Sequence, residues 1–348
     1  MKITSIEIGE IFVPLVTPFK TALRTVENVE DIVICIHTDT DAVGYGEAPP
    51  TAVITGDTKG SIVTAIRDFI APAITGMDIL ESSSVDMALY DLYAKNLGLP
   101  LYQVLGGSAD TVETDLTISV DTVDKMVADS LAAVSQGYRI LKVKVGKEGM
   151  ADVERIRAIR EAVGPDVAIR VDANQGWTPK DAVRIIRQME DLALDIDLVE
   201  QPVGAHDLAG MQYVTKNTYT PILADESVFC PEDAIRIIQM GAADLINIKL
   251  MKTGGIYEAL KIANIAEIYG VQCMMGCMLE SKIAVSAAAH LTAAKSIITR
   301  ADLDGPGLCR IDPYTGGPRY EANQIHMTDA PGIGITKVPG LNGEPGLV

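Results

Sequence analysis

Residues 140–202 read ILKVKVGKEGMADVERIRAIREAVGPDVAIRVDANQGWTPKDAVRIIRQMEDLALDIDLVEQP. Short runs of β-branched and other apolar residues alternate in this stretch with amphipathic segments, such as 150–163 and 178–192. The alternation recurs roughly every 25 to 30 residues, which is typical of β-strands joined by crossover helices. The stretch therefore predicts parallel βα units.

Eight apolar runs of this kind follow one another along the chain. They begin near Glu113, Ile140, Val167, Ile196, Pro221, Asp244, Val271 and Ser296. Eight parallel units favour a closed (β/α)8 barrel over an open doubly wound sheet. The predicted fold class is therefore α/β, a (β/α)8-type barrel with an α+β capping domain.

The capping domain is expected from the two ends of the chain. Residues 1–108 combine antiparallel strand patterns with two helical patterns, which indicates an α+β unit. Residues 312–348 are rich in Gly and Pro and strand-like in places, and we expect them to return to that unit. The barrel then occupies residues 109–311, a size that is ordinary for this fold.

Charge and hydropathy exclude several classes of partner. The chain carries 47 acidic and 29 basic residues, a formal net charge of −18, which repels nucleic-acid phosphates and anionic membrane surfaces. No apolar run approaches the ~18 residues of a membrane span, and the first residues lack the apolar block of a signal peptide. We therefore expect a cytoplasmic protein without nucleic-acid or membrane partners, and a homo-oligomer is compatible with these features.

The cysteines and histidines match no familiar site motif. The five cysteines are scattered without CxxC spacing, and the four histidines form no i, i+4 pair. Neither a zinc or redox motif nor a histidine base is therefore suggested by spacing. The chemistry is expected to come from carboxylates and lysines.

The C-terminal ends of the strands carry the active site in barrels of this kind. Ionisable residues occupy these ends in order: Lys142-Val143-Lys144, Asp172-Ala173-Asn174, Glu200-Gln201-Pro202, Asp225-Glu226-Ser227, Lys249 and Asp302-Leu303-Asp304. Each taken alone has an ordinary explanation as a sheet-edge lysine, a helix N-cap or a turn residue. Together they indicate one site at the mouth of the barrel.

Three of these residues are candidate metal ligands. Asp172, Glu200 and Asp225 would offer oxygen atoms without histidine or cysteine, the set that a hard divalent cation selects. One Mg²⁺ per site is therefore expected. A metal bound to a substrate carboxylate takes up the charge of the ene-diolate that forms when the neighbouring proton is removed.

The lysines are candidate bases. Strand alternation puts Lys142 and Lys144 on one face, whereas Lys249 follows a strand four positions further round the barrel. A lysine base near neutral pH needs a pKa lowered by about three units. Two lysines on opposite faces of one carbon, one removing a proton and the other returning one, predict an epimerase or racemase.

These motifs resemble those of the enolase superfamily, in its muconate-lactonizing-enzyme branch, across essentially the whole chain. The matching elements are Lys142-Val-Lys144, Asp172-Ala-Asn174-Gln-Gly-Trp177, Glu200-Gln-Pro202, Ala224-Asp225-Glu226-Ser227 and Asn247-Ile-Lys249 with Thr253-Gly-Gly255. The resemblance implies ene-diolate chemistry with Mg²⁺ and a lysine base.

Within this branch the chain is similar to dipeptide epimerases, in particular the L-Ala-D/L-Glu epimerases. The resemblance implies that Asp302 and Asp304 hold the terminal ammonium of a dipeptide and that Cys277, in the sequence 276–280, lines the peptide. Thr117 and Lys142 would touch the substrate carboxylate. By the same resemblance Lys144 abstracts the proton of the L form.

The loops 18–25 and 49–56 would close over the site and select the residue that is inverted. Arg24 would pair with a glutamyl side chain, which favours L-Ala-L/D-Glu from cell-wall peptide recycling as the substrate. Apolar residues near the site, such as Val53 and Ile54, make a hydrophobic dipeptide the second choice. One departure concerns the cap, because only Ile79 to Ser84 stand where the family has a longer, largely helical stretch.

Two other kinds of function stay open from the sequence. N-acylamino acid racemases, o-succinylbenzoate synthases and muconate cycloisomerases share the lysines and the metal ligands, but an anionic pair at Asp302 and Asp304 suits an ammonium better than an acyl group. A barrel that only binds a peptide is the remote alternative, against which the presence of all lysines and carboxylates argues.

Overall fold

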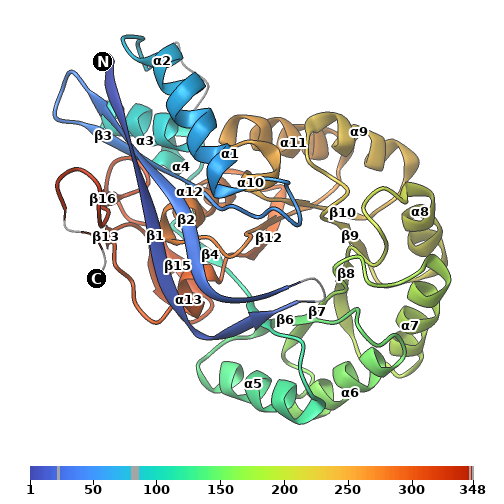
Figure 1. The fold of residues 1–348 in the computed structure, drawn as a ribbon. Coiled ribbons are helices and arrows are strands. Elements are labelled where there is room, and N and C mark those ends of the chain that lie inside the picture. The colour runs from blue at the N-terminus through green and yellow to red at the C-terminus, as the bar shows by residue number, and fades with distance from the viewer. Residues whose placement is uncertain (22–23, 80–85, 345, 347–348) are drawn as a thin grey trace.

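The computed structural model describes residues 1–21, 24–79, 86–344 and 346. Eight parallel strands form the central sheet in chain order, and helices cover its outer side (Figure 1). The strands are β5 (Leu116–Ile118), β6 (Ile140–Lys144), β7 (Ala168–Asp172), β8 (Ile196–Glu200), β9 (Ile222–Ala224), β10 (Leu245–Ile248), β11 (Cys273–Gly276) and β12 (Ile298–Asp302). The predicted α/β barrel is confirmed.

Nine helices follow these strands in the described part of the chain. They are α5 (Val123–Ser135), α6 (Ala151–Val163), α7 (Pro179–Asp191), α8 (Leu208–Asn217), α9 (Pro231–Met240), α10 (Leu250–Thr253), α11 (Ile256–Tyr269), α12 (Lys282–Ala294) and α13 (Gly305–Leu308). Amphipathic patterns account for the packing, since Ile185, Ile186 and Met189 of α7 are buried while its polar residues face outward. None of the described helices has the length and apolar character that a bilayer crossing requires.

The barrel is nearly closed at the seam between β12 and β5. The amide of Asp115 donates to the carbonyl of Ala301 at 3.3 Å, and Arg170 donates to both the Asp115 carboxylate (2.8 Å) and the Ala301 carbonyl (3.0 Å). The expected first strand near Glu113 needs correction here. Glu113 belongs to β4 (Thr111–Glu113), which pairs with a C-terminal strand, and the first barrel strand starts three residues later.

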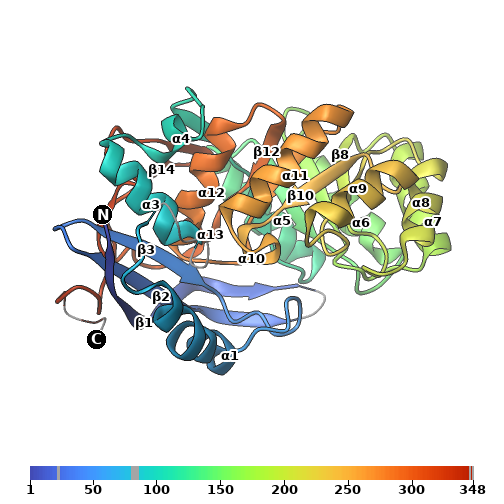
Figure 2. The same cartoon turned by 90° about the horizontal axis from the view of Figure 1, so that it is seen from above.

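The N-terminal region forms an antiparallel sheet of β1 (Ile3–Lys20), β2 (Thr25–Thr38) and β3 (Val43–Ala48). On one face, Ile32, Ile34 and Ile36 pack with the helical segment that follows the sheet. The helices are α1 (Lys59–Thr64), η1 (Ala65–Ile70), α2 (Ala71–Ile74), α3 (Asp86–Leu97) and α4 (Leu101–Val104). Figure 2 shows this sheet lying across one side of the barrel, with α1 on its outer face.

The C-terminal segment contacts both regions. It contains β13 (Thr315–Gly316), β14 (Arg319–Glu321), β15 (Gln324–His326) and β16 (Ile335–Lys337), and β15 pairs with β4. The hydroxyl of Tyr45 in β3 donates to the carbonyl of Thr336 at 3.3 Å. We keep the three-part division at 1–108, 109–311 and 312–348 as a proposal. The shortened cap segment expected at Ile79 to Ser84 lies almost wholly in residues 80–85, outside the described residues.

Asp91 in α3 joins three parts of the cap. Its carboxylate is fully buried and accepts hydrogen bonds from the amides of Tyr45 (3.0 Å) and Ile333 (2.8 Å) and from the ammonium of Lys95 (2.7 Å). The C-terminal segment approaches so closely that a Cβ at Gly332 would lie 2.0 Å from an Asp91 oxygen. This one carboxylate therefore ties β3, α3 and the C-terminal segment together.

Replacing Asp91 by alanine is expected to lower the free energy of unfolding by about 3–5 kcal/mol, because Lys95 and two buried amides lose their partner. Urea denaturation followed by circular dichroism measures the change. Asp68→Ala is the matched control, since Asp68 pairs with Arg67 on the surface and its loss should leave the free energy of unfolding nearly unchanged. Equal effects of the two variants would contradict the role given to Asp91.

Candidate active site

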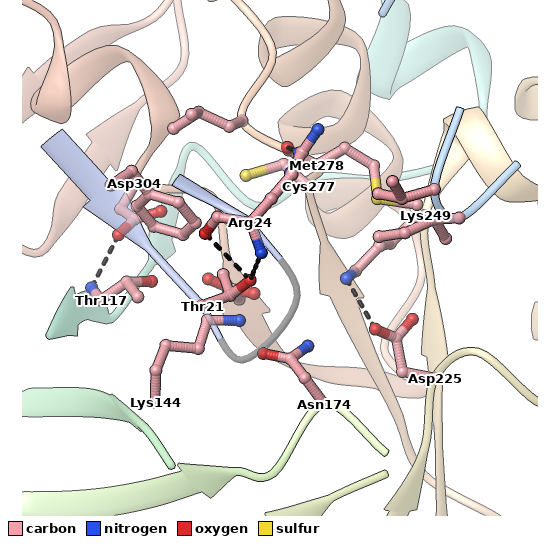
Figure 3. A pocket seen from close by; sticks show the side chains of 15 residues that line it. Thr21, Arg24, Thr117, Lys144, Asn174, Asp225, Lys249, Cys277, Met278 and Asp304 are labelled. Carbon is pink, nitrogen blue, oxygen red and sulfur yellow. Dashed lines mark hydrogen bonds and ion pairs between the residues drawn. The ribbon is translucent and has the colours of Figure 1, made fainter. Parts of the chain in front are cut away.

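The strand ends of the barrel and two segments of the cap enclose a pocket (Figure 3). Eight of the eleven predicted site residues line it: Arg24, Thr117, Lys144, Asp225, Lys249, Cys277, Asp302 and Asp304. The other three, Lys142, Asp172 and Glu200, are buried behind this surface and contact the lining residues. The structure thus brings the whole predicted set together.

Lys142 lies in the middle of the buried carboxylates. Its Nζ atom is 2.6 Å from Asp302 Oδ2, 2.8 Å from Glu200 Oε2 and 3.2 Å from Asp172 Oδ2, and the residue is 1% exposed. Lys144 lies on the same face of β6 as Lys142, as expected, and is the last residue of that strand. Its Nζ atom lies 2.6 Å from Asp172 Oδ2, and the residue borders the pocket. Only one of the two lysines therefore borders the pocket.

Lys249 reaches the pocket from a different strand than Lys144. Figure 3 shows the side chains of Lys144 and Lys249 extending toward the same space. The Lys249 Nζ atom lies 2.8 Å from Asp225 Oδ2 and 4.0 Å from Glu200 Oε1. The path of the Lys249 side chain depends on Gly276 in the neighbouring strand β11, because a Cβ at Gly276 would lie 2.8 Å from Lys249 Cε. Glycine at that position leaves the space that the lysine side chain needs.

Two residues without a role in the sequence analysis orient the carboxylates. Lys252 lies 2.5 Å from Asp225 Oδ1 and also donates to the backbone carbonyl of Asn247 at 3.1 Å. The side-chain amide of Asn247 donates to Glu200 Oε1 at 2.9 Å. Lys252 was missed because it lies in α10 rather than at a strand end, although its spacing of three residues from Lys249 puts it within one helical turn.

The pKa values of these groups reflect the short distances between buried carboxylates and ammonium groups. Burial alone would lower the pKa of Lys249, but the charge of Asp225 outweighs it and raises the pKa above the usual range. Burial would raise the pKa of Asp225, yet Lys249 and Lys252 hold it well below the usual value. Burial raises the pKa of Glu200 to about 8, and the charge of Asp172 acts in the same direction.

The lowered pKa expected of a lysine base is therefore not produced at Lys249 by the protein groups around it. Asp225 is the largest cause of the raised value. Neutralisation of Asp225 by a bound cation would remove that cause, so a base function of Lys249 would require a bound cation.

The donor set fits a hard cation. Asp172, Glu200 and Asp225 are buried at the ends of three neighbouring strands, and the amide of Asn174 holds Asp172 Oδ1 at 2.9 Å. Among the described residues, Glu226 Oε2 and Asn174 Oδ1 are buried oxygens without a hydrogen-bond partner. Buried, unpaired oxygens beside carboxylates are suited to a hard cation and its bound water.

The backbone is strained at the same strand ends. Asn174 and Gln201, which follow β7 and β8, have φ values of 42° and 36°. Such left-handed conformations cost of order 1–3 kcal/mol each and cluster at functional sites. They turn the chain sharply after two of the candidate metal ligands, and the Gln201 side chain accepts the Asp225 amide at 2.9 Å.

Asp302 and Asp304 differ in their surroundings. Asp302 accepts a hydrogen bond from Lys142, and its pKa is lowered because the ammonium charges outweigh burial. Asp304 accepts the backbone amide of Thr117 at 2.7 Å. Burial raises the pKa of Asp304 to about 6, helped by the charge of Asp302. Asp304 is thus the member of the pair that takes up a proton first as the pH falls.

The cap contributes a cation and apolar groups. Arg24 donates to the carbonyl of Met278 at 3.0 Å, and burial lowers its pKa against the charges of Glu280 and Asp31. Phe19, Val53 and Ile54 complete the cap side of the pocket. Burial raises the pKa of the Cys277 thiol well above its usual range, which argues against a thiolate nucleophile.

The sequence and the fold match known proteins. The family model described as "Enolase C-terminal domain-like" matches residues 125–338. An L-Ala-D/L-Glu epimerase of Clostridium acetobutylicum is 51% identical, with 96% of this chain and 99% of that protein covered. A hydrophobic dipeptide epimerase of Enterococcus faecalis is 42% identical, with 97% and 100% covered.

Solved structures agree with these matches. The substrate-liganded complex of the L-Ala-D/L-Glu epimerase from Bacillus subtilis has a TM-score of 0.95 at 50% identity, with 96% of this chain and 99% of that chain covered. The dipeptide epimerase from Enterococcus faecalis, complexed with Mg and the dipeptide L-Leu-L-Tyr, has a TM-score of 0.92 at 42% identity, with 97% and 100% covered.

Proposed function

Because the chain belongs to the enolase superfamily, we propose that it is a magnesium-dependent dipeptide epimerase that inverts the α-carbon of the C-terminal residue. Its relatives identify it as an isomerase that acts on amino-acid derivatives. The observation that carries the proposal is the placement of Lys144 and Lys249, which border one pocket from strands four positions apart in the barrel.

The two lysines would transfer protons on opposite faces of the substrate. One amine takes the α-proton as the C–H bond breaks, and the opposite ammonium gives a proton to the other face, so that the configuration inverts. Mg²⁺ bound by Asp172, Glu200 and Asp225 would stabilise the negative charge that develops on the substrate carboxylate. Lys144 is assigned to the L form.

The remaining site residues would position the dipeptide. Asp302 and Asp304 would bind its terminal ammonium, and Cys277 would line the peptide. Thr117 borders the pocket and would contact the substrate carboxylate. Lys142, which is buried behind the pocket, would act on that carboxylate through its charge and hold Asp302 and Glu200 in place.

Two side-chain classes fit the cap. Arg24 favours an acidic residue, and L-Ala-L/D-Glu is the preferred substrate, which would give the enzyme a role in cell-wall peptide recycling in the cytoplasm. Val53, Ile54 and Leu279 border the same pocket and favour a hydrophobic residue as the second choice. Acylamino acid racemase, o-succinylbenzoate synthase and muconate cycloisomerase chemistry are the alternatives, and a peptide-binding barrel without catalysis is the remote one.

Removal of either Lys144 or Lys249 should suppress inversion of the α-carbon while leaving exchange of the α-proton with solvent for one stereoisomer. Lys144→Ala and Lys249→Ala are each expected to lower epimerisation at least about 100-fold. Each variant should still exchange the α-proton of one stereoisomer with deuterated water, because one base remains on one face. Proton NMR follows both reactions. Lys261→Ala on the surface of α11 is the control, and exchange of both stereoisomers by both variants would contradict the two-face arrangement.

Arg24→Ala should distinguish the two substrate classes. A dipeptide library is incubated with enzyme and Mg²⁺ in deuterated water, and mass spectrometry reads the mass gain at the C-terminal residue. If Arg24 binds a glutamyl carboxylate, its loss costs about 1.5–3 kcal/mol, or roughly 10- to 150-fold in kcat/KM for acidic dipeptides only.

Arg184→Ala on the exposed side of α7 should leave the library profile unchanged. Undiminished turnover of L-Ala-L-Glu by Arg24→Ala would remove the acidic-substrate proposal. Absence of mass gain with every dipeptide, in the unmodified enzyme, would favour the racemase and synthase alternatives.

Dipeptide affinity should fall as the pH drops through about 6. Asp304, whose pKa is raised to about 6, binds the substrate ammonium only when ionised, so its protonation weakens binding at low pH. Calorimetric titration with the equilibrated mixture of epimers measures the dissociation constant without reaction heat. Asp304→Asn keeps an acceptor for the Thr117 amide, and this variant should bind weakly at every pH without a step near pH 6.

Asp304→Asn is a sharper test than Asp302→Asn, because Asp302 is also the partner of Lys142. A dipeptide with an acylated terminus lacks the ammonium and should show no step in either protein. A step near pH 6 that persists in Asp304→Asn would assign the titration to another group.

A further inference from the structure

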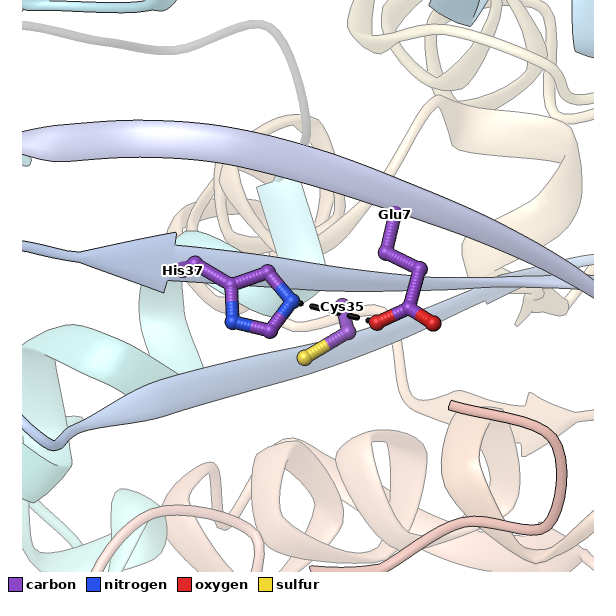
Figure 4. Close-up of side chains that lie close together, drawn as sticks. All are labelled: Glu7, Cys35 and His37. Carbon is purple, nitrogen blue, oxygen red and sulfur yellow. Dashed lines mark hydrogen bonds and ion pairs between the residues drawn. The ribbon is translucent and has the colours of Figure 1, made fainter. Parts of the chain in front are cut away.

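Three side chains of different ligand type meet on the N-terminal sheet, outside the barrel. The ligand atoms of Glu7, Cys35 and His37 all lie within 4.8 Å of one another (Figure 4). Among the described residues, no other group of three histidine, cysteine or acidic residues is as compact. His37 Nε2 and Glu7 Oε2 are 3.1 Å apart.

Strand register brings these residues together. Cys35 and His37 are two positions apart in β2, so their side chains lie on the same face. Glu7 in β1 pairs directly with Cys35, and Ser5 pairs with His37. Opposite residues in an antiparallel pair have Cβ atoms roughly 5 Å apart. The backbone ladder therefore fixes the three side chains without any loop, which preorganises them.

We propose that Glu7, Cys35 and His37 bind a zinc ion. A thiolate, an imidazole and a carboxylate are the three ligand types of zinc, and a thiolate selects a softer ion than Mg²⁺. The barrel site offers oxygen atoms only, so the two sites select different metals. The site is independent of the proposed epimerase function.

The surroundings allow an ion to enter and be held. Cys35 is fully buried, whereas the side chains of His37 and Glu7 are 27% and 39% exposed, so the site opens to solvent on one side. Solvent there would supply water as the fourth ligand. The amide of Asn342 donates to Glu7 Oε2 at 2.9 Å and orients this carboxylate from outside.

Burial raises the pKa of the Cys35 thiol to about 12, and the charge of Glu7 acts in the same direction, so the ion itself must displace the thiol proton. Lys95, the ammonium whose charge lowers this pKa, is held by Asp91 at 2.7 Å. Binding would release the thiol proton to solvent as the Zn–S bond forms, without any redox change. The ion would join β1 to β2 beside the C-terminal segment that carries Asn342, and it would stabilise the cap.

The simpler arrangement is an ion pair between His37 and Glu7 above a buried thiol. The metal site and the metal-free ion pair differ in one measurable property, because only the metal site forms a metal–thiolate bond. Co²⁺ is a spectroscopic substitute for zinc, and a thiolate ligand gives it a charge-transfer band in the near ultraviolet. Oxygen ligands of the barrel site give no such band.

The experiment titrates the full chain with Co²⁺ in excess Mg²⁺ under reducing conditions. We expect a thiolate band that saturates at one equivalent and disappears when Zn²⁺ is added. Cys35→Ala should abolish the band, and His37→Gln should weaken Co²⁺ binding at least about tenfold. Cys230→Ala and His206→Gln are matched controls, because these residues lie outside the cluster and should leave the titration unchanged.

Circular dichroism and epimerase turnover verify that each variant is folded. If Cys35→Ala does not fold, His37→Gln decides the question, because His37 is partly exposed and its replacement leaves the sheet core intact. Absence of a thiolate band in the unmodified protein, its persistence in Cys35→Ala, or an unchanged affinity in His37→Gln would overturn the proposal.

Discussion

Four carboxylates and four ammonium groups among the described residues form a network of short ion pairs at the mouth of the barrel, and each of these side chains is at most 8% exposed. Isolated buried charges cost many kcal/mol, so such a set is stable only if every member has an opposite partner at short distance. The distances between partners are 2.5–3.2 Å. The members are Asp172, Glu200, Asp225, Asp302, Lys142, Lys144, Lys249 and Lys252. The positions of the strand ends are constrained by this balance.

The cap is attached to the barrel by buried hydrogen bonds rather than by apolar packing alone. Glu47 in β3 accepts the amides of Ser281 (2.9 Å) and Ala284 (2.7 Å) at the start of α12. The backbone amide of Lys20 in β1 donates to the hydroxyl oxygen of Ser119, just after β5, at 3.0 Å. These contacts hold the segments that carry Phe19 and Arg24 against the barrel. A barrel for the chemistry and a separate cap for selectivity would account for relatives that are an L-Ala-D/L-Glu epimerase and a hydrophobic dipeptide epimerase.

The proposed metal sites differ in ligand chemistry and in structural purpose. The proposed barrel site would draw oxygen ligands from three parallel strands, and Lys249 would depend on the ion for its function as a base. The sheet site draws sulfur, nitrogen and oxygen from two antiparallel strands and would serve stability. The softness of the ligands would make the two sites select different metals, since a thiolate disfavours Mg²⁺ and an all-oxygen set favours it.

The sequence by itself determined the barrel and most of the candidate site. The βα repeat predicted the strands, and the carboxyl ends of parallel strands meet at one mouth, so Asp172, Glu200 and Asp225 were placed together by order alone. Periodicity does not reveal how deep a side chain lies, and for this reason only the structure showed that Lys142 is buried behind Lys144.

Only the tertiary structure decided which residues meet across strands and beyond strand ends. Lys252 reaches Asp225 from a short helix, and Glu113 belongs to a strand that pairs with the C-terminal segment. Glu7 meets Cys35 because of the register of β1 on β2, which depends on packing of both faces of the sheet. The physical reason is common to all three: local pattern fixes the type of element and its faces, whereas partners distant in sequence are set by the packing of whole elements.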